Sequence, residues 1–135
     1  MPIAELLCTD LSSVEVALQA GTDRIELCAA LEVGGVTPGI GLLRAAVALA
    51  TGQAGIVALI RPRRGDFQLD GPGGLALLLA EVEAAREAGA EGVAVGVLRA
   101  DGLVDFTSMA ALVHAAAPMK VTFHRAIDHV ADPED

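Results

Sequence analysis

The sequence has very few aromatic side chains, and this scarcity limits how its core can be built. Aromatic residues make up 2% of the 135 residues, with no Trp and no Tyr, although hydrophobic residues make up 53%. Small aliphatic side chains must therefore fill the core, as is typical of helices packed on a parallel sheet whose strands are buried on both faces. The length suffices for one hydrophobic core, so we predict that residues 1–135 form a single domain.

Basic residues are also scarce, since Lys120 is the only lysine and the net charge is −9. Binding to nucleic acid is not expected, because phosphate contacts need clustered Lys and Arg side chains. The sequence contains no apolar run that approaches the roughly 20 residues needed to span a bilayer. It also does not open with the basic and apolar segments of a signal peptide. We therefore expect a cytoplasmic protein that does not bind membranes.

Short apolar segments alternate with longer segments of helical periodicity. We predict strands over residues 3–8, 24–28, 55–61, 91–97 and 119–124, and helices over 13–20, 38–50, 75–88 and 105–116. Strands that alternate with helices in units of about 30 residues indicate a parallel sheet with right-handed crossovers. An open doubly wound sheet and a β/α barrel both fit this pattern. No GxGxxG follows the first strand, which disfavours the dinucleotide-binding version of the open sheet.

Polar side chains lie within or directly after these apolar strands. Glu5 and Glu26 lie in the first two strands, Arg61 ends the third, and His124 ends the fifth. Charge in a buried strand is costly unless it is paired, and the carboxyl ends of parallel strands are where sites are built. If these groups converge, they can bind a small polar or anionic molecule, with Glu5, Glu26 and His124 as acid–base groups. The alternative is a structural charge network in which Glu26 pairs with Arg61.

Further charged residues follow the third and fifth strands. Guanidinium groups suit the recognition of carboxylate or phosphate. On this basis we predict substrate-binding roles for Arg61, Arg63, Asp66, Arg125 and Asp128. The alternative is a solvated loop in which Arg63 or Arg64 pairs with Asp66, while Asp128 only accepts hydrogen bonds from the local backbone.

Four segments together resemble the CutC family of copper homeostasis proteins. They are residues 23–41 (DRIELCAALEVGGVTPGIG), 60–67 (IRPRRGDF), 92–105 (GVAVGVLRADGLVD) and 121–128 (VTFHRAID). The resemblance implies a TIM-type β/α barrel, which has eight strands and about 250 residues when complete. We therefore expect an incomplete barrel of about five parallel strands and four helices, equivalent to the N-terminal part of the family and truncated before the sixth strand.

The same resemblance implies a role in copper homeostasis, with Cu(I) as the metal. Thiolate is a soft ligand that suits Cu(I), so Cys28 is the candidate ligand and Cys8 its possible partner. In a reducing cytoplasm both are expected to be thiols. Because strand residues alternate between faces, Glu26 and Cys28 share a face, whereas Cys8 points away from the face of Glu5. A small buried cysteine without metal is the alternative.

Three functions remain open from the sequence. The first is copper handling, and the second is a barrel enzyme or enzyme remnant that acts on a small polar or anionic substrate. The third is an incomplete barrel without activity. The expected partners are thus a copper ion or a small polar ligand. Because the edges of an incomplete barrel invite pairing with another chain, we also expect a homo-oligomer.

Overall fold

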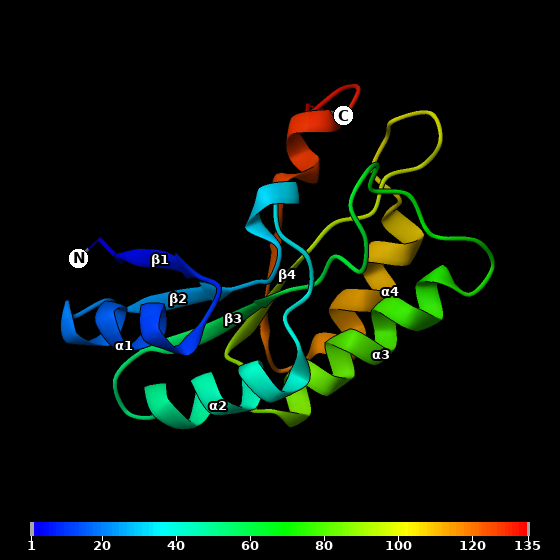
Figure 1. Ribbon diagram of the computed structural model, residues 1–135. Helices are drawn as coiled ribbons and strands as arrows, with labels where there is room; N and C mark the ends of the chain where they lie inside the picture. Colours follow the sequence, from blue (N-terminus) through cyan, green and yellow to red (C-terminus); the bar gives the residue numbers. More distant parts are fainter. Residues whose placement is uncertain (1, 135) are drawn as a thin grey trace.

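The computed structural model describes residues 2–134, in which strands and helices alternate along the chain (Figure 1). The strands are β1 (Glu5–Cys8), β2 (Arg24–Leu27), β3 (Gly55–Leu59), β4 (Gly92–Val95) and β5 (Lys120–Phe123). The α-helices are α1 (Leu11–Gln19), α2 (Ile40–Ala50), α3 (Gly74–Glu87) and α4 (Phe106–Ala116). Two short 3₁₀ helices, η1 (Leu31–Val33) and η2 (Arg125–His129), follow β2 and β5. None of the helices in this part of the chain has the length and apolar character needed to cross a membrane.

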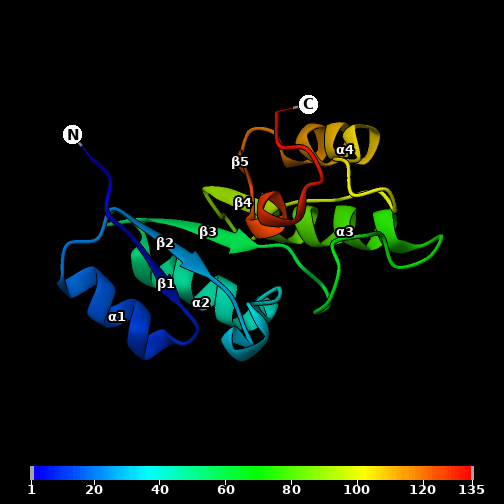
Figure 2. The same cartoon turned by 90° about the horizontal axis from the view of Figure 1, so that it is seen from above.

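All five strands are parallel, and their order in the sheet is their order in the chain. The α-helices lie along one side of the curved sheet, as Figures 1 and 2 show. Sequential strand order with helices on one side is the arrangement of a β/α barrel wall, whereas a doubly wound sheet reverses its order and carries helices on both sides. The predicted incomplete barrel of five parallel strands and four helices is confirmed.

The main hydrophobic core lies between the sheet and the helices. Ile25 of β2, Val93 of β4, Val14 of α1 and Leu112 of α4 are fully buried there. A fully buried side chain of this kind contributes about 1.5–3 kcal/mol relative to an exposed one. A smaller apolar cluster lies on the other, concave face of the sheet, and its members are Cys28, Val57, Leu59 and Ala94. The helix-covered face therefore supplies most of the packing, and the concave face has room for polar groups.

Two of the α-helices begin after an aspartate that caps the first turn. The Asp10 carboxylate accepts a hydrogen bond from the Ser13 N–H at 2.7 Å and caps α1. The Asp105 carboxylate accepts one from the Ser108 N–H at 3.0 Å and caps α4. Each bond satisfies a backbone donor that the first helical turn leaves without a partner.

The strand register arranges the concave face in rows across the sheet, as in the layered interior of a β/α barrel. The first row contains Glu5, Arg24 and Gly55. The second row contains Leu7, Glu26, Val57, Gly92 and Lys120. The third row contains Leu59, Ala94 and Thr122, with Cys28 beside Leu59. The top row, two residues further along the last three strands, contains Arg61, Gly96 and His124.

Candidate functional site

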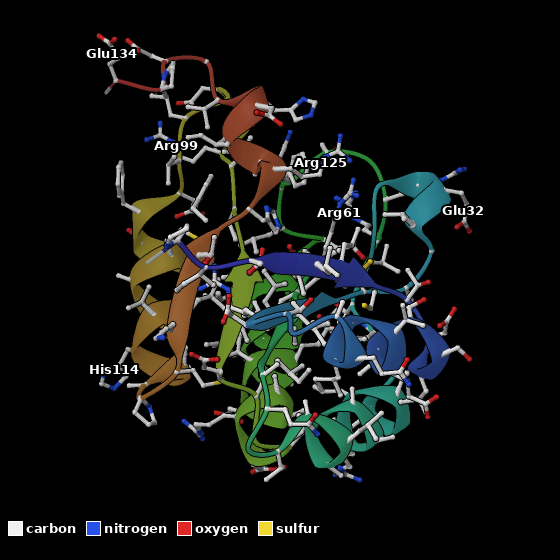
Figure 3. All side chains as sticks on the ribbon, turned by 90° about the vertical axis from the view of Figure 1, so that its left-hand side faces the viewer. Glu32, Arg61, Arg99, His114, Arg125 and Glu134 are labelled. Atoms are coloured by element: carbon white, nitrogen blue, oxygen red, sulfur yellow. The ribbon has the colours of Figure 1, made fainter. Side chains whose placement is uncertain are left out.

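The concave face forms a hollow of about 500 Å³. It is lined by Leu7, Glu26, Cys28, Leu31, Gly34, Leu59, Ala94, Thr122, His124, Arg125 and Asp128. The structure thus brings together several of the predicted site residues, which come from β2, from the end of β5 and from η2. Figure 3 shows Arg125 and Arg61 at the same end of the sheet, near the short helices η2 and η1.

Glu5 does not reach this end of the sheet. It is the first residue of β1, and its carboxylate forms an ion pair with the guanidinium of Arg24, the first residue of β2. The prediction that Glu5 converges with His124 at the carboxyl ends of the strands is therefore wrong. The register places Glu5 in the first row, where Arg24 is its partner. Of the two predicted glutamates, only Glu26 lines the hollow.

Glu26 lines the hollow from the second row. Its side chain is half-buried, and burial raises the pKa of its carboxyl group above the ordinary value. The negative charge of Glu5 raises this pKa further, while the positive charge of Arg24 lowers it. The alternative prediction of a Glu26–Arg61 ion pair is not met, since no ion pair between residues 2 and 134 involves Arg61. Glu26 thus has the raised pKa that suits a general acid or base.

Arg61 is a buried cation that is held by backbone carbonyl groups. Only 8% of it is exposed. Its Nη1 donates to the carbonyl oxygens of Val33 and Gly35, both at 3.1 Å, and its Nη2 donates to that of Gly65 at 3.1 Å. The guanidinium lies over the ring of Phe67, 4.8 Å from the ring centre. Its Nε is buried and has no hydrogen-bond partner. Arg61 therefore joins the loops that follow β2 and β3 without a carboxylate to neutralise it.

Thr37 and Glu81 hold the backbone of Arg61, a role that was not predicted for either residue. The N–H of Thr37 donates to the carbonyl oxygen of Arg61 at 2.9 Å, and the N–H of Arg61 donates to Thr37 Oγ1, also at 2.9 Å. The Thr37 hydroxyl donates in turn to Glu81 Oε2 of α3 at 2.8 Å. The helix predicted over residues 38–50 begins only at Ile40, so Thr37 precedes it without capping it.

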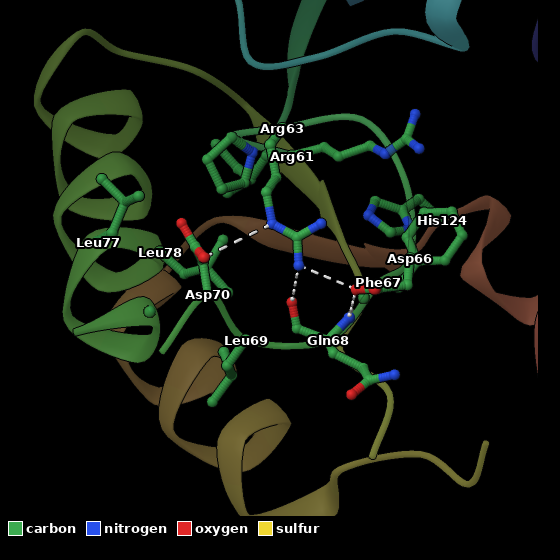
Figure 4. Close-up of a pocket in the computed structure, with 14 residues that line it drawn as sticks. Arg61, Arg63, Asp66, Phe67, Gln68, Leu69, Asp70, Leu77, Leu78 and His124 are labelled. Atoms are coloured by element: carbon green, nitrogen blue, oxygen red, sulfur yellow. Dashed lines mark hydrogen bonds and ion pairs between the residues drawn. The ribbon is translucent and has the colours of Figure 1, made fainter. Parts of the chain in front are cut away.

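His124 is buried at the end of β5, with 8% of the residue exposed. Its Nδ1 accepts a hydrogen bond from the N–H of Ala126 at 3.2 Å, and its ring lies 5.3 Å from that of Phe67 (Figure 4). Burial, followed by the charge of Arg61, lowers the pKa of His124 to about 4. The imidazole is therefore neutral at pH 7, and its Nδ1 lone pair is already in use as the cap of η2.

Arg63 and Asp66 are bound to each other rather than to the hollow. Arg63 Nη2 lies 2.9 Å from Asp66 Oδ1, and the same carboxylate oxygen accepts the N–H of Gln68 at 3.0 Å (Figure 4). Arg63 Nε lies 4.0 Å from Asp70 Oδ1. This is the self-paired loop that we gave as the alternative to a binding role for these two residues.

The two cysteines are free thiols on opposite faces of the sheet. Cys8 packs in the core beneath the helices, whereas Cys28 belongs to the concave cluster. Burial raises the pKa of both thiols, and the carboxylate of Glu26 adds to the rise at Cys28. Between residues 2 and 134, no three His, Cys, Asp or Glu side chains are grouped closely enough to hold a metal ion. The predicted pair is thus not assembled on one face, and only Cys28 of the two lines the hollow.

Comparison with known proteins gives consistent matches. The CutC family profile matches residues 3–135. A family protein CutC from Citrobacter koseri is 43% identical over 136 residues, which cover 98% of this chain and 52% of that protein. One from Mesorhizobium japonicum is 42% identical over 135 residues, which cover 100% of this chain and 51% of that protein. The chain spans about half the length of the curated relatives it matches.

A solved structure supports the same relationship. The crystal structure of CutC from Streptococcus agalactiae, a protein named for a proposed role in copper homeostasis, matches with a TM-score of 0.88 and 26% sequence identity. The match covers 96% of this chain and 62% of that one. The family profile, the identity to named relatives and the shared fold agree with the four segments of the sequence that carried the resemblance. This chain belongs to the CutC family.

Proposed function

We propose that this chain takes part in copper homeostasis in the cytoplasm and binds Cu(I) through Cys28. The position of Cys28 is the observation that carries the proposal, because it is the cysteine that lines the hollow, whereas Cys8 is covered by helices. Cu(I) prefers soft thiolate ligands. The family relationship and the name of the S. agalactiae protein point to the same metal.

Copper binding at Cys28 has to release a proton. Only the thiolate binds metal, and burial and the Glu26 carboxylate raise the pKa of the Cys28 thiol. The affinity for Cu(I) should therefore rise with pH over the neutral range. His124 lines the same hollow and is neutral at pH 7, as an imidazole must be to bind a metal.

An anaerobic Cu(I) titration against a competing chelator tests this proposal. The chain should take up one equivalent of Cu(I), and Cys28→Ser should abolish that uptake. Cys8→Ala is the matched control, since it removes the other thiol from the opposite face of the sheet and should leave the affinity unchanged. Circular dichroism checks that each variant is folded. A Cys28→Ser variant that keeps the affinity of the parent chain would overturn the proposal.

Glu26 supports a second candidate function, that of a barrel enzyme acting on a small polar or anionic substrate. Its carboxyl group is half-buried in the hollow, and burial raises its pKa above the ordinary value, as is common for groups that transfer protons. A screen of small phosphorylated and carboxylated compounds, followed by mass spectrometry, would detect turnover. Glu26→Gln should remove the turnover and keep the fold, whereas Glu83→Gln, on the exposed side of α3, should keep both. A Glu26→Gln variant that turns over substrate normally would exclude this role.

We also propose that the chain self-associates. Within residues 2–134, β1 and β5 are the two edges of the sheet, and each pairs with one neighbouring strand only. Leu6 and Leu7 of β1 are 46% and 45% exposed. An open strand edge beside exposed apolar side chains favours pairing with another chain. Light scattering over a range of concentrations should show a dimer or larger species, and a monomer throughout would contradict the proposal.

A further inference from the structure

Two guanidinium groups lie beside Gly34, where Arg125 lines the hollow and Arg61 is buried and does not line it. A Cβ atom placed on Gly34 would lie 3.1 Å from Nη1 of Arg61 and would overlap Nη1 of Arg125. Gly34 also has a φ of +89°, a conformation that residues with a side chain rarely adopt. Glycine at this position therefore allows Arg61, from the end of β3, and Arg125, from the start of η2, to approach each other.

No carboxylate within residues 2–134 forms an ion pair with either cation. Arg61 is more than nine-tenths buried, its hydrogen bonds go to uncharged carbonyl groups, and its Nε has no partner. The carboxylates that line the hollow belong to Glu26 and Asp128, and neither lies within ion-pair distance of a guanidinium. Arg125 is exposed, but its charge acts on the buried Arg61, and two neighbouring like charges of which one is buried cost free energy unless a counter-charge is supplied.

We propose that the top of the hollow is an oxyanion site, which binds the phosphate or carboxylate group of a small molecule between Arg61 and Arg125. The exposed guanidinium of Arg125 donates the hydrogen bonds, and Arg61 supplies its uncompensated charge from its buried position beside Gly34. Guanidinium groups match the planar, bidentate geometry of such anions. The proposal rests on the second candidate function, for which it names the anionic group of the substrate, and it requires neither Cys28 nor copper.

His124 provides a reporter for the site. It lies in the same row as Arg61, and the positive charges of Arg61 and Arg125 both contribute to its low pKa. An oxyanion bound between the two arginines would offset these charges, and the pKa of His124 would rise. Removal of the Arg125 charge would also raise the pKa of His124 in the absence of any ligand. The effect of the substitution can therefore be measured without ligand, and the effect of the ligand can be measured on the parent chain.

Calorimetric titration with inorganic phosphate, and separately with acetate, tests the proposal on the full chain. The parent chain and Arg44→Gln, which removes an exposed charge on α2, should bind phosphate equally. Arg125→Gln should bind roughly tenfold to a hundredfold more weakly, as expected for the loss of charge-assisted hydrogen bonds. Gly34→Ala should weaken binding as well, because a methyl group would separate the guanidiniums. In NMR titrations at a phosphate concentration that just saturates the parent chain, phosphate should raise the pKa of His124 in the parent chain and raise it much less in Arg125→Gln.

The outcomes separate this site from the two proposed functions. Acetate binding without phosphate binding would identify a carboxylate as the ligand group. Phosphate binding that survives in both Cys28→Ser and Glu26→Gln would support the oxyanion site even where copper binding or turnover is absent. Equal phosphate affinity in the parent chain and Arg125→Gln would overturn the proposal, and so would no binding of either anion at millimolar concentration.

Discussion

Replacing Thr37 with Val should loosen the end of β3, because a single hydroxyl joins Arg61 to α3. This hydroxyl accepts the N–H of Arg61 at 2.9 Å and donates to Glu81 Oε2 at 2.8 Å. Val has the same branched shape as Thr, so the substitution removes both hydrogen bonds while the side chain keeps its rotamer preference. The Arg61 N–H and the Glu81 carboxylate then lose their partner together.

The expected cost follows from the burial of the two groups. A hydrogen bond contributes about 1 kcal/mol, and a buried polar group left without a partner costs about 1–3 kcal/mol. Arg61 is 8% exposed, so its N–H has little access to water. Glu81 is only half-buried and regains part of its hydration. We therefore expect Thr37→Val to lower the free energy of unfolding by about 2–3 kcal/mol.

The loss should also depend on pH through Glu81. Burial raises the pKa of its carboxyl group above the ordinary 4.5, and the hydrogen bond from Thr37 partly lowers it again. Because the unfolded chain gives up this proton first as the pH rises above 4.5, the raised pKa makes the folded state less stable at higher pH. Without Thr37 the pKa of folded Glu81 rises further. Thr37→Val should therefore cost more at pH 7 than at pH 5.

Urea unfolding followed by circular dichroism at pH 7 and pH 5 measures both effects. Thr107→Val is the matched control, because Thr107 is exposed on α4. Thr37→Ser keeps the hydroxyl and should retain most of the stability. If Thr37→Val costs no more than Thr107→Val, the hydrogen-bond reasoning is refuted. An equal loss at both pH values would show that Glu81 does not depend on Thr37.

Two further predictions concern the top row of the hollow. NMR titration of His124 should give a midpoint of about 4. Because this folded pKa lies below the ordinary 6.5, stability should fall as the pH drops from 6.5 towards 4, and a midpoint near 6.5 would contradict the burial argument. In Gly96→Ala, the new Cβ would lie 2.9 Å from Nδ1 and Cε1 of His124, so the free energy of unfolding should fall by about 1–3 kcal/mol, whereas Gly41→Ala, in open space, should not lower it.

The order of strands and helices was predictable because short, mainly apolar segments alternate with longer segments of helical periodicity. The limits of the strands were harder to place. The third strand was predicted to reach Arg61, but β3 ends at Leu59, because the N–H of Arg61 is bound by the side chain of Thr37 instead of a neighbouring strand. The short helices η1 and η2 were missed, since 3₁₀ segments of a few residues carry no periodic pattern.

The candidate site was predictable only in part. Strand alternation correctly placed Cys8 and Cys28 on opposite faces, because that rule needs no knowledge of partners. The ion pair of Glu5 depends on the register between β1 and β2, which one sequence does not reveal. The partners of Arg61 are backbone carbonyls. Every residue has a backbone carbonyl, so the sequence does not reveal which residues bind Arg61. Only Glu81 could have been identified from the sequence pattern. It is an acidic residue between the buried Leu78 and Val82 of α3, and such a position indicates a carboxylate that needs a hydrogen-bond partner.

The row spacing limits which ligands can connect the two ends of the hollow. Glu26 pairs in register with Val57, four residues before Arg61 on the same strand, which corresponds to about 13 Å along the backbone. Inorganic phosphate bound at Arg61 and Arg125 is therefore too small to reach Glu26, whereas an extended phosphate monoester or dicarboxylate is long enough. Cys28 lies in the row between, so a ligand of that length would cover its thiol.

Competition between copper and anions should therefore depend on the length of the anion. Inorganic phosphate should leave the Cu(I) titration of the parent chain unchanged. An extended phosphorylated compound that spans the rows should weaken Cu(I) uptake by Cys28. Arg125→Gln should remove this effect of the long compound while leaving copper binding itself intact. Copper uptake that is indifferent to every anion that binds would show that Cys28 does not lie between the two ends of a shared ligand site.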